Sequence, residues 1–324
     1  MFGGVEKWLG FFGGGFNGTD CSGGGSCDTR GKGFFVIDLN DGTVIWSFTH
    51  GASGENAAMD YSLPAHPGIV DTDNDGYIDT AYIGDLGGNM WRFKFCTKLE
   101  MDADTCTSTA HWTGARFFNA TGGGEGLRPV YNYPTVTKDR SNNLWVYWST
   151  GDKSDPAANS TNEKVLGVKD NTRSAMYSLN DLENVTSSAT VSCGNKYGWY
   201  VNFTGREKAL TDITAFGGVV YFTTFVPPAG ADACGTAGES FLYAIDYQDC
   251  TGALAGNIRM MSLGAGISSA PMISMKPGGA LPVDIFVTRS GGGGQGAGTI
   301  RIPFNPPTLS NKTNLIYWKD RRLQ

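Results

Sequence analysis

The sequence predicts an all-β protein and, within that class, a β-propeller, in which small antiparallel sheets stack face to face around an axis. Gly supplies 47 of the 324 residues and aromatic side chains 12%, a composition typical of many short strands joined by tight turns. A strand–turn–strand unit recurs along the chain. No segment has the periodicity of a long amphipathic helix.

The repeated unit is a strand, a polar turn that contains Gly, and a second strand with an aromatic residue. Its clearest copies read GFFVIDLNDGTVIWSF and DTAYIGDLGGNMWRFKF. Alternation of apolar and polar residues in TVIWSF and MWRF predicts strands with one buried face. The units predict five blade cores, at residues 33–48, 79–95, 143–182, 218–254 and 283–304. A β-sandwich is the alternative fold, but it would not repeat units of this kind.

Residues 1–324 are expected to form a single propeller domain. The net charge of −6 argues against a nucleic-acid partner, which requires a basic face. No apolar run approaches the roughly 18 residues that span a bilayer. The first residues lack the basic and apolar regions of a secretory signal. We therefore expect the C-terminal part of a longer protein, or a chain that lacks an N-terminal region.

Six of the seven cysteines form three local pairs, which indicates the disulfides of an extracellular protein. The predicted pairs are Cys21–Cys27, Cys96–Cys106 and Cys234–Cys250. Cys193 is left over, either as a buried thiol or as a partner for something outside the chain. Metal binding by cysteines is the alternative, but the sequence has no C-x-x-C pair and no Cys/His cluster.

The segment VDTDNDGYID concentrates four carboxylates within nine positions. Like charges this close destabilise a fold unless something neutralises them. The D-x-D-x-D-G-x-x-D spacing wraps oxygen ligands around a hard cation, and the flexible geometry of Ca²⁺ suits it better than that of Mg²⁺. The predicted ligands are the carboxylates of Asp71, Asp73, Asp75 and Asp79 and the backbone carbonyl of Tyr77. An ordinary acidic turn is the alternative.

The remaining polar residues predict no catalytic site, and we expect a protein that is not an enzyme. The three histidines, at positions 50, 66 and 111, have no metal-ligand spacing, and GISSAP at 266–271 resembles a nucleophile elbow only superficially. A second acidic set has loose spacing that favours a solvated loop over a second cation site. Its members are Asp152, Asp155, Glu163 and Asp170.

Several strings together resemble the C-terminal propeller of the PilY/PilC-type proteins, tip-associated adhesins of bacterial type IV pili. The most specific is YSLPAHPGIVDTDNDGYIDTAYIGDLGGNMWRFKF, and the resemblance runs from about residue 8 to about residue 318. It implies a modified, seven-bladed, calcium-binding propeller, of which about five blade cores are visible here. The family's calcium loop maps onto the five ligands predicted above.

The resemblance also implies where the protein acts and with what. It implies export through the periplasm and outer membrane to the cell surface and the pilus tip. The implied roles are pilus biogenesis, opposition to retraction and surface adhesion. The implied partners are minor or major pilins, the outer-membrane secretin, and a host or abiotic surface. Because open sheet edges are a liability, we also expect an N-terminal partner chain or segment to cover the propeller edge.

Two other functions remain open from the residues. VIDLNDGTVIW also resembles the tryptophan-docking repeat of quinoprotein dehydrogenases, which use pyrroloquinoline quinone and calcium. That site would need a metal with an open position, whereas this loop fills the shell with its own chain. The third candidate is an integrin-like calcium-dependent ligand-binding propeller. Such proteins repeat the loop in several blades, whereas this chain has it once.

Overall fold

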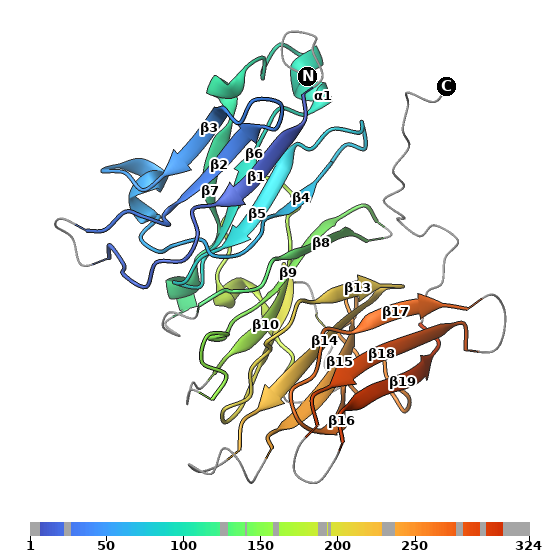
Figure 1. The fold of residues 1–324 in the computed structure, drawn as a ribbon. Coiled ribbons are helices and arrows are strands. Elements are labelled where there is room, and N and C mark those ends of the chain that lie inside the picture. The colour runs from blue at the N-terminus through green and yellow to red at the C-terminus, as the bar shows by residue number, and fades with distance from the viewer. Residues whose placement is uncertain are drawn as a thin grey trace.

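The computed structural model describes residues 7–22, 27–123, 129–139, 141–157, 162–186, 193, 196–228, 237–276, 281–291 and 296–306. Within them, five sheets follow one another in chain order, and neighbouring sheets lie side by side (Figure 1). The first two sheets lie at the top of the view and the last two at the bottom. Each sheet contains one of the predicted blade cores, so the prediction of a propeller with five visible cores is confirmed.

The strands pair mostly with their neighbours in the chain, as in the antiparallel meanders of propeller blades. The first sheet contains β1 (Leu9–Gly13), β2 (Gly33–Asp38) and β3 (Val44–Thr49). The second contains β4 (Gly68–Val70), β5 (Thr80–Gly84), β6 (Met90–Lys94) and β7 (Thr113–Phe118). The third contains β8 (Thr135–Lys138), β9 (Leu144–Ser149), β10 (Lys164–Lys169), β12 (Gly198–Asn202) and β11 (Glu183–Asn184), the last of which pairs parallel to β12.

The fourth and fifth sheets complete the series. The fourth contains β13 (Thr214–Phe216), β14 (Val219–Val226), β15 (Glu239–Asp246) and β16 (Met260–Ala265), and the fifth β17 (Met272–Met275), β18 (Val283–Arg289) and β19 (Gly298–Phe304). The helices are short: α1 (Lys98–Asp102) and the 3-10 turns η1 (Gly54–Ala58), η2 (Thr109–His111), η3 (Ala120–Gly123) and η4 (Leu179–Asp181). No described helix has the length and apolar character to cross a bilayer.

The hydrophobic core is divided into layers between successive sheets. β9 shows why, since all six residues of LWVYWS are buried. Trp145 and Tyr147 contribute to the layer against the fourth sheet, whereas Val146 and Trp148 contribute to the layer against the second. Because successive side chains of a strand point to opposite faces, a central blade needs apolar residues at consecutive positions.

A recurring hydrogen-bonded hairpin explains the Asp-to-Trp spacing of the repeat. In the second sheet, Asp85 accepts hydrogen bonds from the backbone N–H of Asn89 (2.9 Å), from its Nδ2 (2.9 Å) and from Trp91 Nε1 (2.8 Å). In the third sheet, Asp139 accepts the equivalent three bonds from Asn143 and Trp145, at 2.9, 2.8 and 3.0 Å. The carboxylate thus ties the turn to the indole that enters the core. This role is structural and does not require a quinone cofactor.

The prediction of a half-buried strand at MWRF is wrong for β6. Arg92 is almost fully buried, although the alternating pattern assigns it to a solvent-facing side. Its Nη1 donates to Asp170 Oδ2 (3.0 Å) and to the backbone O of Ala175 (3.1 Å), and the Tyr82 hydroxyl donates to the same Asp170 oxygen (2.6 Å). The side of β6 that carries Arg92 therefore faces the third sheet, where the buried Asp170 carboxylate pairs with the guanidinium.

Two of the three predicted disulfides are present, and the third is wrong. Cys21 pairs with Cys27 and Cys96 with Cys106. Cys250, however, pairs with Cys193, 57 positions away in the sequence, and Cys234 lies outside the described residues. The prediction was based on spacing along the chain, whereas Cys193 and Cys250 meet because both belong to one core layer between the third and fourth sheets. Packing brings together two cysteines that the sequence separates widely.

Candidate calcium site

The predicted calcium loop joins β4 to β5 in the second sheet. The backbone N–H of Asp79 donates to the carbonyl of Val70 (3.2 Å) and closes the loop. Asn74 (φ 62°) and Gly76 (φ 94°) both adopt the left-handed conformation that turns the chain sharply. A Cβ at Gly76 would meet nothing within 4 Å, so the backbone conformation, and not space, favours glycine there.

Three of the four predicted carboxylates converge. Asp71, Asp73 and Asp79 each offer an oxygen, and these oxygens lie within 4.8 Å of one another. Asp71 accepts hydrogen bonds from the backbone N–H groups of Gly76 (2.7 Å) and Asp75 (3.2 Å). Asp73 also accepts from Asp75 N–H (3.2 Å). Backbone N–H groups directed at the carboxylates partly offset their repulsion and shape the loop for a cation.

Asp75 is the predicted ligand that stands apart from this group. Its Oδ1 accepts a hydrogen bond from the backbone N–H of Tyr77 (2.7 Å). Burial raises the pKa of Asp75, and the charges of Asp73, Asp71 and Asp79 raise this pKa further. The carboxylate therefore experiences the negative field of the cluster that a cation would relieve. Metal ligation by Asp75 and by the Tyr77 carbonyl stays a prediction.

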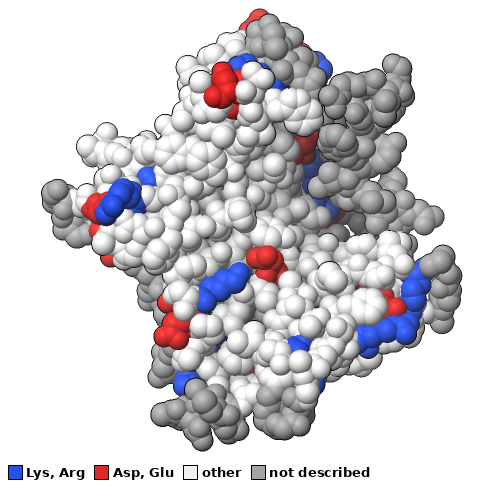
Figure 2. Space-filling model, viewed as in Figure 1, with Lys and Arg blue, Asp and Glu red and all other residues white. Residues whose placement is uncertain are grey.

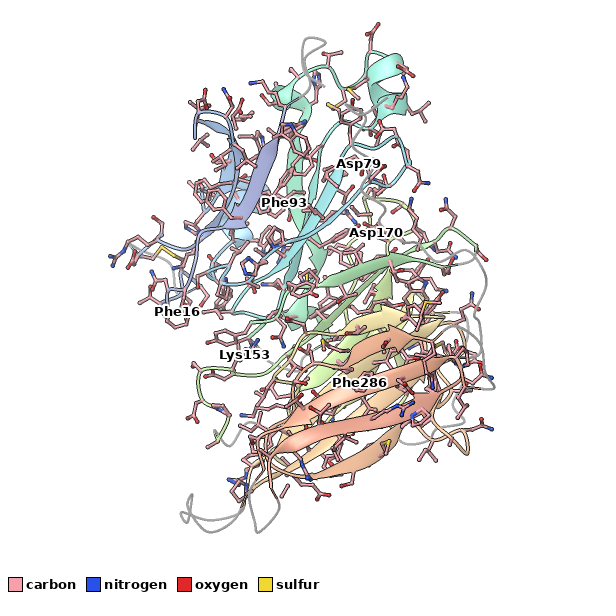
Figure 3. The ribbon with its side chains drawn as sticks, turned by 45° about the vertical axis from the view of Figure 1, so that its right-hand side comes forward. Phe16, Asp79, Phe93, Lys153, Asp170 and Phe286 are labelled. Atoms are coloured by element: carbon pink, nitrogen blue, oxygen red, sulfur yellow. A yellow bond between two sulfur atoms is a disulfide. The ribbon has the colours of Figure 1, made fainter. Side chains whose placement is uncertain are left out.

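Asp79 is the most buried of the four, with 1% of its surface exposed. Its Oδ2 accepts hydrogen bonds from the backbone N–H and the hydroxyl of Thr72, both at 2.7 Å. Its Oδ1 accepts from the Thr80 hydroxyl (2.7 Å). Figure 3 shows Asp79 and Asp170 in the region where the second and third sheets meet. The last predicted ligand of the loop is thus fixed inside the protein, whereas Asp73 and Asp75 lie nearer the surface.

Two basic residues from the third sheet and the segment after β10 hold the loop, and neither was predicted from the sequence. Lys138, at the end of β8, donates from Nζ to the backbone O of Thr72 (2.9 Å) and to Asn74 Oδ1 (3.0 Å). Arg173, in the segment after β10, lies with its Nη2 3.4 Å from Asp79 Oδ1. Both residues are more than 60 positions from their partners, and no local pattern signals such contacts.

The donor set fits a hard cation. It consists of carboxylate oxygens in a tight loop with no nitrogen or sulfur ligand, which is the chemistry that Ca²⁺ prefers. The other acidic set does not form a site. Glu163 accepts from the Thr150 hydroxyl (2.6 Å), Asp152 from Ser154, and Asp170 belongs to the buried pair with Arg92. No metal-binding group among the described residues includes them.

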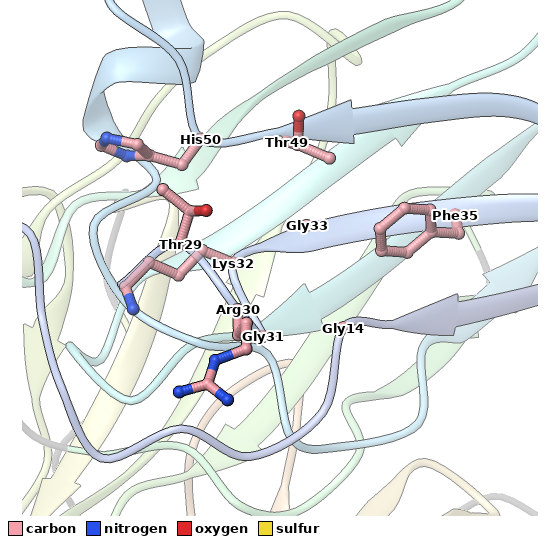
Figure 4. A pocket seen from close by; sticks show the side chains of 9 residues that line it. All are labelled: Gly14, Thr29, Arg30, Gly31, Lys32, Gly33, Phe35, Thr49 and His50. Carbon is pink, nitrogen blue, oxygen red and sulfur yellow. The ribbon is translucent and has the colours of Figure 1, made fainter. Parts of the chain in front are cut away.

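One pocket among the described residues lies elsewhere, on the first sheet (Figure 4). It has a volume of about 560 Å³, and its lining includes Arg30, Lys32, Phe35 and His50 but no carboxylate. A quinoprotein site needs a catalytic carboxylate beside its metal, and this pocket does not provide one. His50 Nε2 lies 3.9 Å from Cys27 Sγ, which is bonded to Cys21. That cysteine pair is therefore not available as metal ligands.

Charged side chains form small, separate groups on the face shown in Figure 2, where red and blue patches alternate on a mostly uncharged surface. A continuous basic field, which a nucleic-acid partner would require, is not visible on that face. Most described ion pairs are isolated in the same way, whereas Arg173 and Asp284 each take part in two. The acidic loop 71–79 is the exception, with four carboxylates in nine positions.

Comparison with known proteins agrees with this fold and with the region of the loop. Residues 4–141 match the family model described as the PilY1 beta-propeller domain. The chain is 25% identical over 318 residues to a type IV pilus biogenesis factor PilY1 homolog of Xylella fastidiosa, covering 88% of this chain and 21% of the relative. It is 29% identical over 126 residues to type IV pilus biogenesis factor PilY1 of Pseudomonas aeruginosa. That match covers 34% of this chain and 10% of the relative.

A solved structure supports the same assignment at the level of the fold. The crystal structure of the Pseudomonas aeruginosa PilY1 C-terminal domain aligns with a TM-score of 0.59 at 18% identity, covering 85% of this chain and 66% of that one. The chain spans about a fifth of the length of the first curated relative. Together, the matched family model, the named relatives and the shared fold support a PilY1-type C-terminal β-propeller.

Proposed function

We propose that this propeller binds one calcium ion at residues 71–79 and acts in type IV pilus biogenesis. The observation that carries the proposal is the convergence of Asp71, Asp73 and Asp79 within the region that matches the family model. The relatives named as pilus biogenesis factors support the second half of the proposal. Because the chain spans a small part of those relatives, it would contribute one module to the function of a longer assembly.

Calcium would act here by neutralising the loop and fixing its position. The loop lies between the second and third sheets, so a rigid loop also holds these two blades together. An ion that binds only the folded chain stabilises it by mass action, by about 2.7 kcal/mol when its concentration is 100 times Kd. Calcium sites of extracellular modules work at modest affinity, because the ion is plentiful there.

The finer parts of the function follow from the family resemblance. We place the protein outside the cell at the pilus tip, where it opposes retraction and contributes to adhesion to a host or abiotic surface. Its partners would be minor or major pilins and the outer-membrane secretin. Exposed apolar side chains lie at one end of the first sheet, just before β1, just after β2 and at the start of β3. They include Trp8, Leu39 and Val44, and a predicted N-terminal partner could cover them. The proposed role is not enzymatic.

The two alternatives have weaker support. A quinoprotein dehydrogenase would use the Asp-to-Trp repeat for docking between blades, but the repeat already has a structural role in the Asp85 and Asp139 hairpins. An integrin-like propeller would repeat the calcium loop, and the sequence contains this loop once. The relatives with pilus names favour the pilus function over both.

The proposal predicts a loss of surface pili when the loop is neutralised. The gene is deleted and complemented with wild type, with Asp71→Ala/Asp75→Ala, or with Asp102→Ala as a control for an exposed carboxylate outside the loop. Surface pili are counted by electron microscopy. We expect few pili after deletion, recovery with wild type and the control, and failed recovery or abnormal retraction with the double variant. Normal piliation in the deletion strain would refute the pilus function.

A further inference from the structure

A cationic side chain from a neighbouring sheet already contacts the acidic loop. Arg173 lies in the segment that follows β10, and its guanidinium reaches the start of β5. Its Nε donates to Thr80 Oγ1 (3.1 Å), and its Nη2 donates to the backbone O of Asp79 (3.1 Å) and lies 3.4 Å from Asp79 Oδ1. Within the described ranges, no other Lys or Arg side chain forms an ion pair with the four loop carboxylates.

We propose that Arg173 is the resident counter-ion of the loop: it neutralises Asp79 when no metal is bound and thereby lowers the affinity of the loop for calcium. The inference rests on the proposed calcium function and deepens it, because it names the residue that sets the affinity. A site built from carboxylates alone would bind calcium more tightly than this one. Arg173 would keep the loop neutral enough to fold before the ion arrives.

The electrostatic effect of Arg173 on calcium is large. Because Arg173 Nη2 lies 3.4 Å from Asp79 Oδ1, the guanidinium would be a close neighbour of an ion held by Asp79. The Arg173 side chain is only 20% exposed, so water screens this repulsion incompletely. Coulomb repulsion between a divalent ion and a unit charge at such a distance changes an affinity by about tenfold or more.

The opposing effect is that Arg173 also positions Asp79, and the structure indicates that this effect is smaller. Without Arg173, Asp79 keeps the hydrogen bonds from the N–H and hydroxyl of Thr72 and from the hydroxyl of Thr80. Its own N–H still donates to Val70. Three hydrogen bonds thus still hold the carboxylate and one holds its backbone, so the loss of the charge should outweigh the loss of orientation.

Arg173 itself has enough other partners to stay in place when calcium binds. Its backbone N–H donates to Asp170 Oδ1 (2.9 Å), and its Nη1 lies 3.7 Å from Glu100 Oε1 on α1. Coupling between two sites is reciprocal. If Arg173 weakens calcium binding, calcium must reduce the contribution of Arg173 to stability. The protein without calcium should therefore depend on Arg173 more than the loaded protein does.

The test is calcium titration by calorimetry on the full chain, with thermal unfolding measured with and without calcium. The variants are Arg173→Gln, which removes the charge, Arg173→Lys, which keeps it, and Arg30→Gln, a matched control at an exposed arginine in the turn before β2. We expect Arg173→Gln to bind calcium about tenfold more tightly than wild type, and Arg173→Lys to bind less tightly than Arg173→Gln. Arg30→Gln should match wild type.

Unfolding provides an independent measure of the same coupling. Arg173→Gln should have a lower unfolding temperature than wild type without calcium, and calcium should recover most of the difference. Equal or weaker calcium binding by Arg173→Gln, with wild-type binding intact, would overturn the counter-ion role alone. If calorimetry detects no heat of calcium binding with wild type, both the proposed calcium function and the role of Arg173 are refuted.

Discussion

Replacement of Asp170 by Ala should lower the free energy of unfolding by about 3–5 kcal/mol, the range for breaking one side of a buried ion pair. Asp170 accepts from Arg92 (3.0 Å) and from the Tyr82 hydroxyl (2.6 Å), and its side chain is fully buried. Without it, the Arg92 guanidinium keeps, among the described residues, one hydrogen bond to the carbonyl of Ala175 and its contact with the Phe117 ring, and neither carries a negative charge. An uncompensated buried charge then remains between the second and third sheets.

Chemical denaturation measures this effect, and the exposed pair of Lys98 and Asp102 supplies the control. The ammonium and carboxylate of that pair lie 2.9 Å apart on α1, with both side chains about 60% exposed. Since exposed pairs contribute at most about 1 kcal/mol, Asp102→Ala should be nearly neutral. Equal effects of Asp170→Ala and Asp102→Ala would contradict the buried network.

Loss of the disulfide between Cys193 and Cys250 should have the next largest effect. Its partners are 57 positions apart, so it restricts the unfolded chain more than the other two bonds, with separations of 6 and 10. The chain-entropy relation gives about 4 kcal/mol for a loop of this length. Both sulfurs also lie in a core layer, where a free thiol pair would pack less well.

The experiment compares Cys193→Ala with Cys234→Ala under oxidising conditions. Cys193→Ala should lower the unfolding midpoint strongly, and Cys234→Ala should leave it near wild type. Peptide mapping of the unreduced wild-type protein and of Cys234→Ala should recover the Cys193–Cys250 linkage in both. The reverse order of the two variants would restore the pairing of Cys234 with Cys250 that local spacing predicts.

The repeat pattern predicts the fold well because each blade is a local unit. A strand, an Asp-containing turn and a Trp-containing strand lie within about twenty residues, and the Asp85 and Asp139 hairpins close their own hydrogen bonds. Contacts between blades are different. Arg92 with Asp170 and Cys193 with Cys250 join residues separated by 78 and 57 positions, and no periodicity indicates them. The sequence therefore predicts the blades but not their connections.

The candidate site likewise contains residues that the sequence predicts and residues that it does not. Asp71, Asp73, Asp75 and Asp79 are identifiable from spacing because one loop contains them all. Lys138 and Arg173 reach the loop from the third sheet, and only the packing of the sheets shows that they belong to it. Their contribution explains how four carboxylates remain folded between two blades before any ion binds.

Calcium titration into the purified chain, followed by calorimetry, shows whether residues 71–79 bind calcium. We expect one binding event for wild type and its loss in Asp71→Ala, because Asp71 belongs to the convergent carboxylates and also orders the loop through Gly76. Asp102→Ala should bind as wild type does. Binding that persists unchanged in Asp71→Ala, or no binding by wild type, would contradict the assignment of residues 71–79 as a calcium site.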